Sequence, residues 1–141
     1  MIGGSPRVGH VLRYNYDWSD PGQPETIEKE RPAVIVLTIL RDGERVIARV
    51  APVTHRPPQD TDRALEIPPA TKHRLGLDGE RSWIMLDHFN EFVWPGPEIR
   101  PVPGRSPATI YYGPLPPAFF AQLRAKLLKL LKDRRIRGFW R

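Results

Sequence analysis

The sequence Arg31-Pro32-Ala33-Val34-Ile35-Val36-Leu37 is the clearest indication of the architecture of this chain. Six consecutive apolar residues, rich in Val and Ile, follow the charged run Glu28–Arg31. Short apolar runs of this composition are typical of buried central strands. Proline lacks the N–H that a strand ladder needs, so Pro32 is expected to be the first residue of the strand. Arg31 would then stand at the mouth of the sheet.

Two roles are open for Arg31 at the start of this strand. Its planar guanidinium matches the oxygens of a phosphate, and a rigid strand end would hold it well for that purpose. Alternatively, it is an ordinary surface arginine paired with Glu28 or Glu30, which the charge pattern alone favours.

The composition describes a basic chain of 141 residues without cysteine. This length predicts one domain with a real core. The formal net charge of +6 favours an anionic partner such as nucleic acid or an acidic protein. The lack of cysteine excludes disulfides and thiolate metal sites. Because residues 1–9 contain no apolar signal region and no apolar run could span a bilayer, we expect a cytoplasmic protein without membrane contact.

The 17 prolines divide the chain into short segments. This spacing favours a mostly β (α+β) fold, a small β-barrel, over a helical bundle. The predicted strands are 8–16, 32–37, 45–53, 64–67, 82–87, 91–94 and 109–112. We expect a single domain over residues 1–141, made of a barrel with proline-rich loops (7–113), a C-terminal amphipathic helix (117–133) and a basic tail (134–141).

Two helices are predicted. In the longer one, Phe120, Leu123 and Leu127 recur at intervals of three and four residues. The shorter one, 68–75, opens with proline and ends at Gly76. The basic tail contains two aromatic residues, Phe139 and Trp140, and either binds nucleic acid as an arm or folds back on the domain.

The turn at Asp42-Gly43 predicts a hairpin between strands 32–37 and 45–53. Arg31 lies 11 residues before Asp42, and Thr54 lies 11 residues after Gly43. The start of one hairpin strand lies beside the end of the next, so Arg31 and Thr54 are expected to face each other within a residue or two.

The predicted strand ends carry polar residues that suit metal-free cleavage of RNA by attack of its own 2′-OH. The chain has no glycine-rich phosphate loop, nucleophile elbow or zinc spacing, so no metal or cofactor is expected. Arg31 would clamp the phosphate and Thr54 would donate a hydrogen bond to it. Asp87, His55 or His88 would transfer protons. Dependence on the 2′-OH would make RNA the substrate rather than DNA.

A second set of residues is predicted to contact RNA. Trp18, in the turn-rich loop 17–24, either caps the core or stacks on a base. The predicted RNA-binding residues are Trp18, Arg56, His88 and Asn90.

The ordered motifs Arg31-Pro-Ala-Val-Ile-Val and Ala51-Pro-Val-Thr54, followed by an apolar strand ending at Asp87, resemble the MazF/PemK toxin family of bacterial toxin–antitoxin systems. The resemblance covers residues 8–94. It implies a small SH3-like β-barrel with helices, a homodimer, and a growth inhibitor that cleaves single-stranded RNA without a metal. It further implies an acidic antitoxin protein. The functional positions of the family fall on Arg31, Thr54 and Asp87.

Two arginines of the family pattern are missing from this chain. The position two residues before Asp87 is occupied by Met85, and the position three residues after it by Asn90. If Asp87 is not the base, His55 beside Thr54 is the substitute. The replacements leave an alternative function open, namely a non-catalytic binder on the same fold that inhibits gyrase or binds nucleic acid.

Overall fold

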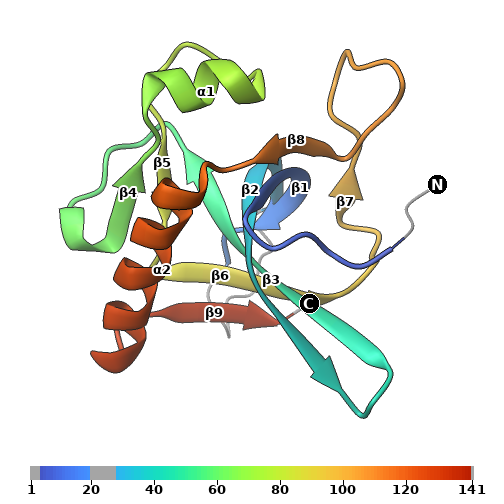
Figure 1. The fold of residues 1–141 in the computed structure, drawn as a ribbon. Helices are drawn as coiled ribbons and strands as arrows, with labels where there is room; N and C mark the ends of the chain where they lie inside the picture. The colour runs from blue at the N-terminus through green and yellow to red at the C-terminus, as the bar shows by residue number, and fades with distance from the viewer. Residues whose placement is uncertain (1–3, 20–27, 141) are drawn as a thin grey trace.

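The computed structural model describes residues 4–19 and 28–140 as a mostly β structure with two α-helices (Figure 1). The strands are β1 (His10–Asp17), β2 (Glu28–Arg41), β3 (Arg45–Thr54), β4 (Ala64–Glu66), β5 (Trp83–Met85), β6 (His88–Val93), β7 (Ile99–Arg100), β8 (Tyr111–Pro114) and β9 (Arg137–Trp140). The helical elements are a short 3-10 turn η1 (Thr61–Arg63), α1 (Pro69–Leu75) and α2 (Pro117–Lys132). Residues 20–27 of the segment predicted as a loop lie outside the described residues.

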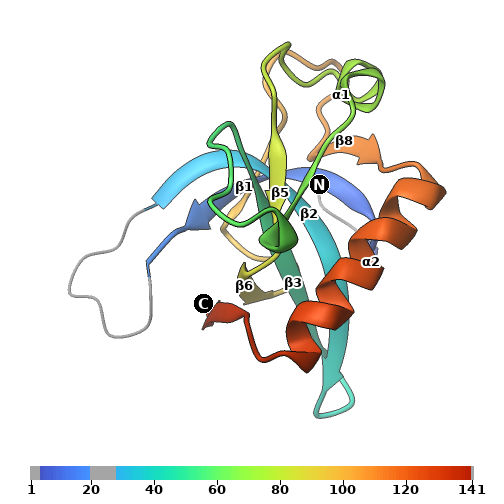
Figure 2. The same cartoon turned by 90° about the vertical axis from the view of Figure 1, so that its left-hand side faces the viewer.

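The strands form one branched sheet. Its main path is β4-β5-β3-β2-β1-β7, with β6 paired to β3, β9 to β6 and β8 to β1. The predicted mostly β class with a C-terminal helix is confirmed. The prediction of a closed barrel is corrected: the strand pairs between described residues form an open, bent sheet (Figure 2). The end strands β4 and β7 have only three and two residues, and proline lies close after each, so neither offers a long edge for closure.

Pro32 lies inside β2 and not at its start, which corrects the expected strand boundary. It pairs with Arg13 of β1. Arg13 donates its own N–H to Ile110 O at 2.9 Å, away from β2, so this pair requires no N–H from the proline. On the other side, the pairing of β2 with β3 begins only at Ala33. Proline is tolerated here because neither neighbouring strand needs its donor.

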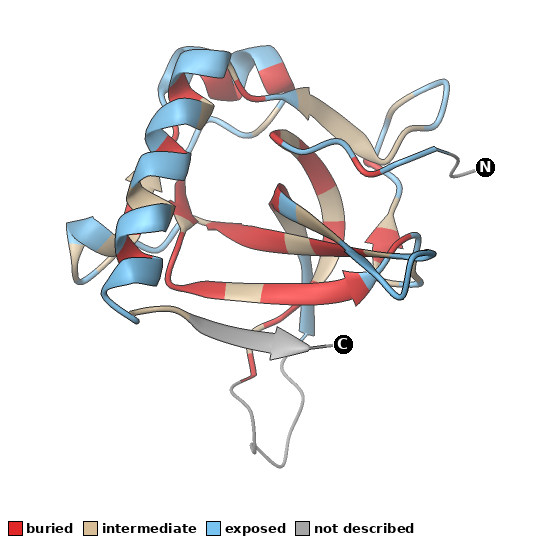
Figure 3. Cartoon of the chain, turned by 60° about the horizontal axis from the view of Figure 1, so that its bottom comes forward, coloured by how far each residue is buried: buried red, intermediate tan, exposed pale blue. Residues whose placement is uncertain are grey.

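Residues 33–36 of β2 are buried on both faces of the sheet, which explains why this part of the strand is apolar without a break. Val34 and Val36 belong to a core that α2 covers. Ala33 and Ile35 belong to a second core, whose largest side chains are aromatic and include Tyr14 and Tyr16 of β1 and Phe92 of β6. Figure 3 shows this contrast between the buried strands and the exposed outer side of α2.

Both predicted helices are present, and each begins with proline at its first turn. Gly76 ends α1 in the left-handed region, with φ of 70°, as a C-cap glycine does. The backbone of the tail folds back on the domain as β9, parallel to β6 (Figure 1). The side chains of residues 137–141 lie outside the described part, so the roles predicted for Phe139 and Trp140 stay predictions. Among the described residues, no helix has the length and apolar character needed to cross a membrane.

Candidate active site

A cleft of about 1010 Å³ lies where the pairing of β2 with β3 stops. Its walls come from β2, from the end of β3 and the loop after it, from η1, and from the segment around β5. The predicted catalytic residues Arg31, Thr54, His55 and Asp87 all line it, together with Trp18, Arg56, Arg63 and Met85. The fold therefore gathers residues from distant parts of the sequence at one concave surface.

The β2–β3 hairpin brings Arg31 and Thr54 together, as the symmetry about its turn predicts. The pair at this end of the ladder, Ala33 with Pro52, lies two residues from each of them. Arg31 Nη1 donates a hydrogen bond to Val53 O at 3.1 Å. Thr54 Oγ1 accepts the Arg56 N–H at 3.1 Å. That bond uses an acceptor site of the threonine hydroxyl, so its proton can still be donated to a ligand.

Arg31 is half-buried and lines the cleft. Its Cζ lies 4.8 Å from the centroid of the Trp18 ring. Its Nε is buried and has no hydrogen-bond partner among the residues that the structure describes. Burial lowers the pKa of Arg31 from its ordinary value, yet an arginine stays protonated near neutral pH. Glu30, one of its two expected ion-pair partners, instead contacts Arg13 at 3.1 Å. Arg31 therefore keeps donor capacity for an anion.

Trp18 fits both interpretations made from the sequence. Its ring centroid lies 4.9 Å from that of Tyr16 and 5.7 Å from that of His88, so it caps the aromatic core. It also lines the cleft beside Arg31.

His88 and Asn90 do not line the cleft. Both belong to β6 and are buried, with 5% and 0% of their surface exposed. His88 Nδ1 lies 2.6 Å from the Tyr16 hydroxyl. The Asn90 amide accepts the Asp17 N–H and donates to Asp17 O, both at 2.9 Å. The RNA contacts predicted for His88 and Asn90 are therefore corrected: both side chains are buried on the side of the sheet that carries Tyr16.

Arg63 is a cleft residue that the sequence did not reveal. Its Nη1 lies 3.5 Å from Asp87 Oδ2, and its Nε lies 3.3 Å from Asp60 Oδ2. Asp60 also caps η1 by accepting the Asp62 N–H at 2.9 Å. In the sequence, the feature that could have indicated the position of Arg63 is Asp60, a residue typical of helix caps, three positions earlier. In the β4–β5 pair, Ala64 lies opposite Met85, so Arg63 directly precedes the partner of Met85, and both residues line the cleft.

His55 stands at the rim of the cleft, next to Thr54. Its Nε2 lies 2.7 Å from Asp78 Oδ2, and its Nδ1 lies 3.6 Å from Glu80 Oε2. The ligand atoms of these three residues lie within 4.8 Å of one another, as in some metal sites. However, the Lys72 ammonium contacts Asp78 Oδ1 at 2.6 Å, so a cation already balances this carboxylate, and we assign no metal here.

Comparisons with known proteins identify the fold. No protein-family model and no curated protein sequence matches this chain. A crystal structure of MazF from Deinococcus radiodurans (form I) is 20% identical, covers 92% of this chain and 99% of its own, and superposes with a TM-score of 0.58. A MazE–MazF structure from the same organism (form III) is 22% identical and covers 90% and 96%, with a TM-score of 0.56. The chain has a MazF-like fold.

In this MazF-like fold, the cleft is built by the β2–β3 hairpin and the β4–β5 pair. The proline-rich segment 95–117 contributes β7 and β8. Both pair with β1, which separates them from β2 and the cleft-forming strands. Arg105 in this segment donates to Leu75 O at 2.7 Å and so ties it to the end of α1. The segment completes the sheet but supplies no cleft-lining residue.

Proposed function

We propose that this protein is the toxin of a toxin–antitoxin pair and cleaves single-stranded RNA as a metal-independent endoribonuclease. The observation that carries this proposal is the meeting of Arg31, Thr54, His55 and Asp87 in one cleft of a MazF-like fold. Attack by the 2′-OH of the substrate requires positive charge at the phosphate and groups that transfer protons. These four side chains can supply both.

In the proposed reaction, the 2′-oxygen forms a bond to phosphorus while the bond from phosphorus to the 5′-oxygen breaks. Arg31 and Thr54 donate hydrogen bonds to the phosphate oxygens, where negative charge increases in the transition state. Asp87 and His55 are the candidates for taking the 2′-OH proton and for protonating the 5′-oxygen. The products would be a 2′,3′-cyclic phosphate and a 5′-hydroxyl.

Arg63 is proposed to supply positive charge that the family pattern would place at Met85. Two observations support this role: Arg63 lines the cleft, and its guanidinium already contacts Asp87. A phosphate could share the guanidinium, because its planar fork presents several N–H groups at once.

The proposed RNA path leads from the cleft to its rim. Trp18 could stack on a base, and the exposed Arg56 could contact a neighbouring phosphate. The whole of residues 1–141 would act as one domain, in a cytoplasmic homodimer.

The proposed protein partner is an acidic antitoxin. One structural neighbour is a MazE–MazF complex, and the net charge of +6 suits an acidic partner.

The direct test is incubation of the purified protein with a long single-stranded RNA and its DNA counterpart, with EDTA present. We expect discrete cuts in the RNA alone, leaving 5′-hydroxyl ends. Arg31→Ala should lower the cleavage rate by about 100-fold or more, the usual effect of removing a transition-state donor. Arg45→Ala, which removes an exposed arginine at the hairpin turn, is the matched control. An Arg31→Ala protein that unfolds normally and cuts at the full rate would disprove the role of Arg31.

A non-catalytic binder on the same fold is the second candidate, and Met85 in the cleft favours it. Methionine can neither transfer a proton nor hold a phosphate. Intact RNA at high concentration of the folded protein would support this candidate.

A further inference from the structure

Lys72 is a buried cation beside the active-site cleft. It belongs to α1 and is 5% exposed. Its ammonium donates to Asp78 Oδ1 and to Ser82 Oγ, both at 2.6 Å, and also to the backbone carbonyl of Glu80. Three acceptors thus satisfy its three N–H groups. Because a buried ammonium is costly to leave unpaired, Lys72 holds Asp78, Ser82 and the Glu80 carbonyl in position around it.

Asp78 is the partner that connects Lys72 to the cleft. Its Oδ1 also accepts the Glu80 N–H at 3.1 Å, while its Oδ2 faces His55 Nε2 at 2.7 Å. Burial raises the pKa of Asp78, but the hydrogen bonds from Lys72, the Glu80 N–H and His55 outweigh burial and lower it from its ordinary value. The carboxylate is therefore ionised near neutral pH and can only accept hydrogen bonds. His55 must donate from Nε2.

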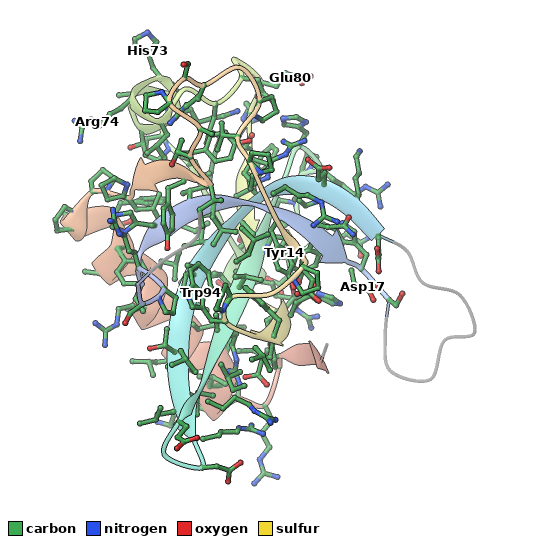
Figure 4. All side chains as sticks on the ribbon, turned by 90° about the vertical axis from the view of Figure 1, so that its right-hand side faces the viewer. Tyr14, Asp17, His73, Arg74, Glu80 and Trp94 are labelled. Carbon is green, nitrogen blue, oxygen red and sulfur yellow. The ribbon has the colours of Figure 1, made fainter. Side chains whose placement is uncertain are left out.

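This contact leaves Nδ1 as the nitrogen of His55 that is available for reaction. His55 follows Thr54, and both line the cleft. Glu80 Oε2 lies 3.6 Å from Nδ1, within ion-pair distance but too far for a hydrogen bond, and the Glu80 side chain is 74% exposed, so this contact leaves Nδ1 accessible to a ligand. Figure 4 shows Glu80 at the same end of the molecule as His73 and Arg74 of α1. The charged groups that contact the ring are Asp78 and Glu80. The charged residues that line the cleft with His55 are Glu28, Lys29, Arg31, Arg56, Asp60, Arg63 and Asp87.

We infer that Asp78, held by Lys72, is a positioning residue that makes Nδ1 of His55 the proton donor to the leaving 5′-oxygen. This inference rests on the proposed ribonuclease function. As the 2′-oxygen bonds to phosphorus, the Asp87 carboxylate takes the 2′-OH proton. The bond from phosphorus to the 5′-oxygen breaks, and that oxygen takes the Nδ1 proton of the imidazolium. His55 is left neutral with its remaining proton on Nε2, where Asp78 accepts it. Proton exchange with water restores both residues.

Asp78→Asn tests this inference because it should reverse the tautomer of His55. Lys72 and the Glu80 N–H both donate at the Oδ1 position, so the amide oxygen of asparagine must occupy it. The amide NH₂ then faces Nε2, which has to accept, and the proton of neutral His55 moves to Nδ1. We expect the imidazole ¹⁵N shifts to report Nε2–H in the unsubstituted protein and Nδ1–H in the variant. The RNA cleavage rate should fall by about 100-fold or more.

Glu80→Gln is the matched control, because it changes another carboxylate near the same ring to an amide. It should keep the Nε2–H tautomer and a cleavage rate close to that of the unsubstituted protein. His55→Ala alters an exposed residue and should fold even if Asp78→Asn does not; its cleavage rate should fall as far.

Two results would overturn the inference. One is full cleavage activity in His55→Ala or in an Asp78→Asn protein with the reversed tautomer. The other is an Nδ1–H tautomer in the unsubstituted protein, which would remove the role of Asp78. If the unsubstituted protein cuts no RNA at all, the proposed ribonuclease function fails and the proton donation with it. The tautomer measurement then still decides whether Asp78 orients His55.

Discussion

Asn90 stabilises the end of β1 from inside the sheet. It is fully buried, and its amide satisfies both the N–H and the carbonyl of Asp17, a residue whose side chain Figure 4 labels. Asn90→Ala would leave these two buried backbone groups without partners. Each such group costs about 1–3 kcal/mol, so we expect the free energy of unfolding to fall by at least that amount. Urea denaturation would measure the fall.

The matched control for Asn90 is Asn15→Ala, which removes an exposed hydrogen bond to Glu28 at 2.6 Å. It should change the free energy of unfolding by no more than about 0.5 kcal/mol. RNA affinity of the folded Asn90→Ala protein should equal that of the unsubstituted protein. A variant with normal stability and weak RNA binding would instead restore the RNA-contact role that the sequence predicts for Asn90.

The residues of the cleft differ in how far the sequence could predict their places. Arg31 and Thr54 follow from one tight turn, because counting outward along a hairpin predicts which residues face each other to within about one position; here an irregularity between Ile35 and Leu37 shifts the register by one. Arg63 reaches Asp87, and Asp78 reaches His55, only through the placement of η1, α1 and β5. No local periodicity encodes those contacts. The burial of Asn90 was hidden for a similar reason, since its partner Asp17 is 73 residues away.

At the scale of elements, α2 supports the turn that carries Arg63. Lys126 Nζ donates to Thr61 O at 2.8 Å and to Ala64 O at 2.9 Å, on either side of that residue. Lys126→Met would remove both bonds, which contribute about 1 kcal/mol each. We expect the amide protons of Arg63 and Leu86 to exchange with solvent about five-fold faster or more. Hydrogen exchange followed by NMR would measure this, and RNA cleavage should weaken in parallel.

Lys129→Met is the control for Lys126, since it makes the same change at an exposed position of the same helix. It should leave both exchange rates unaltered. Equal effects of the two substitutions would show that general loss of charge on α2 is responsible, and not the bracing of η1.

The elements themselves were largely predictable, and the exceptions have physical reasons. Hairpin turns, proline starts and the spacing of apolar residues indicated β1 to β5, parts of β6 and β8, and both helices. The start of β2 was misplaced because a proline is tolerated wherever neither neighbour needs its N–H. β7 has only two residues, too few for a periodic pattern. β9 depends on a parallel pairing with β6, which lies more than 40 residues earlier in the chain.

The charge of the whole molecule indicates an anionic partner, but its total cannot show where that partner binds. The lysines and arginines are spread over many elements, including Arg41 and Arg45 at the β2–β3 hairpin turn, which lies at the far end of the ladder from the cleft (Figures 1 and 2). Arg45 lies near that turn, whereas Arg56 lies on the cleft rim, and both are exposed. This pair can therefore separate local binding from general attraction.

The salt dependence of RNA binding should distinguish Arg56 from Arg45. Each phosphate contact that releases a counterion from single-stranded nucleic acid contributes about −0.7 to the slope of log affinity against log salt concentration. Arg56→Ser should reduce the slope by about 0.7, whereas Arg45→Ser, with the same change in total charge, should leave it nearly unchanged. A single-stranded RNA with 2′-O-methyl groups suits the measurement, because its blocked nucleophile prevents cleavage. Equal changes in slope for both variants would mean that RNA responds to the net charge of the protein and does not occupy the cleft.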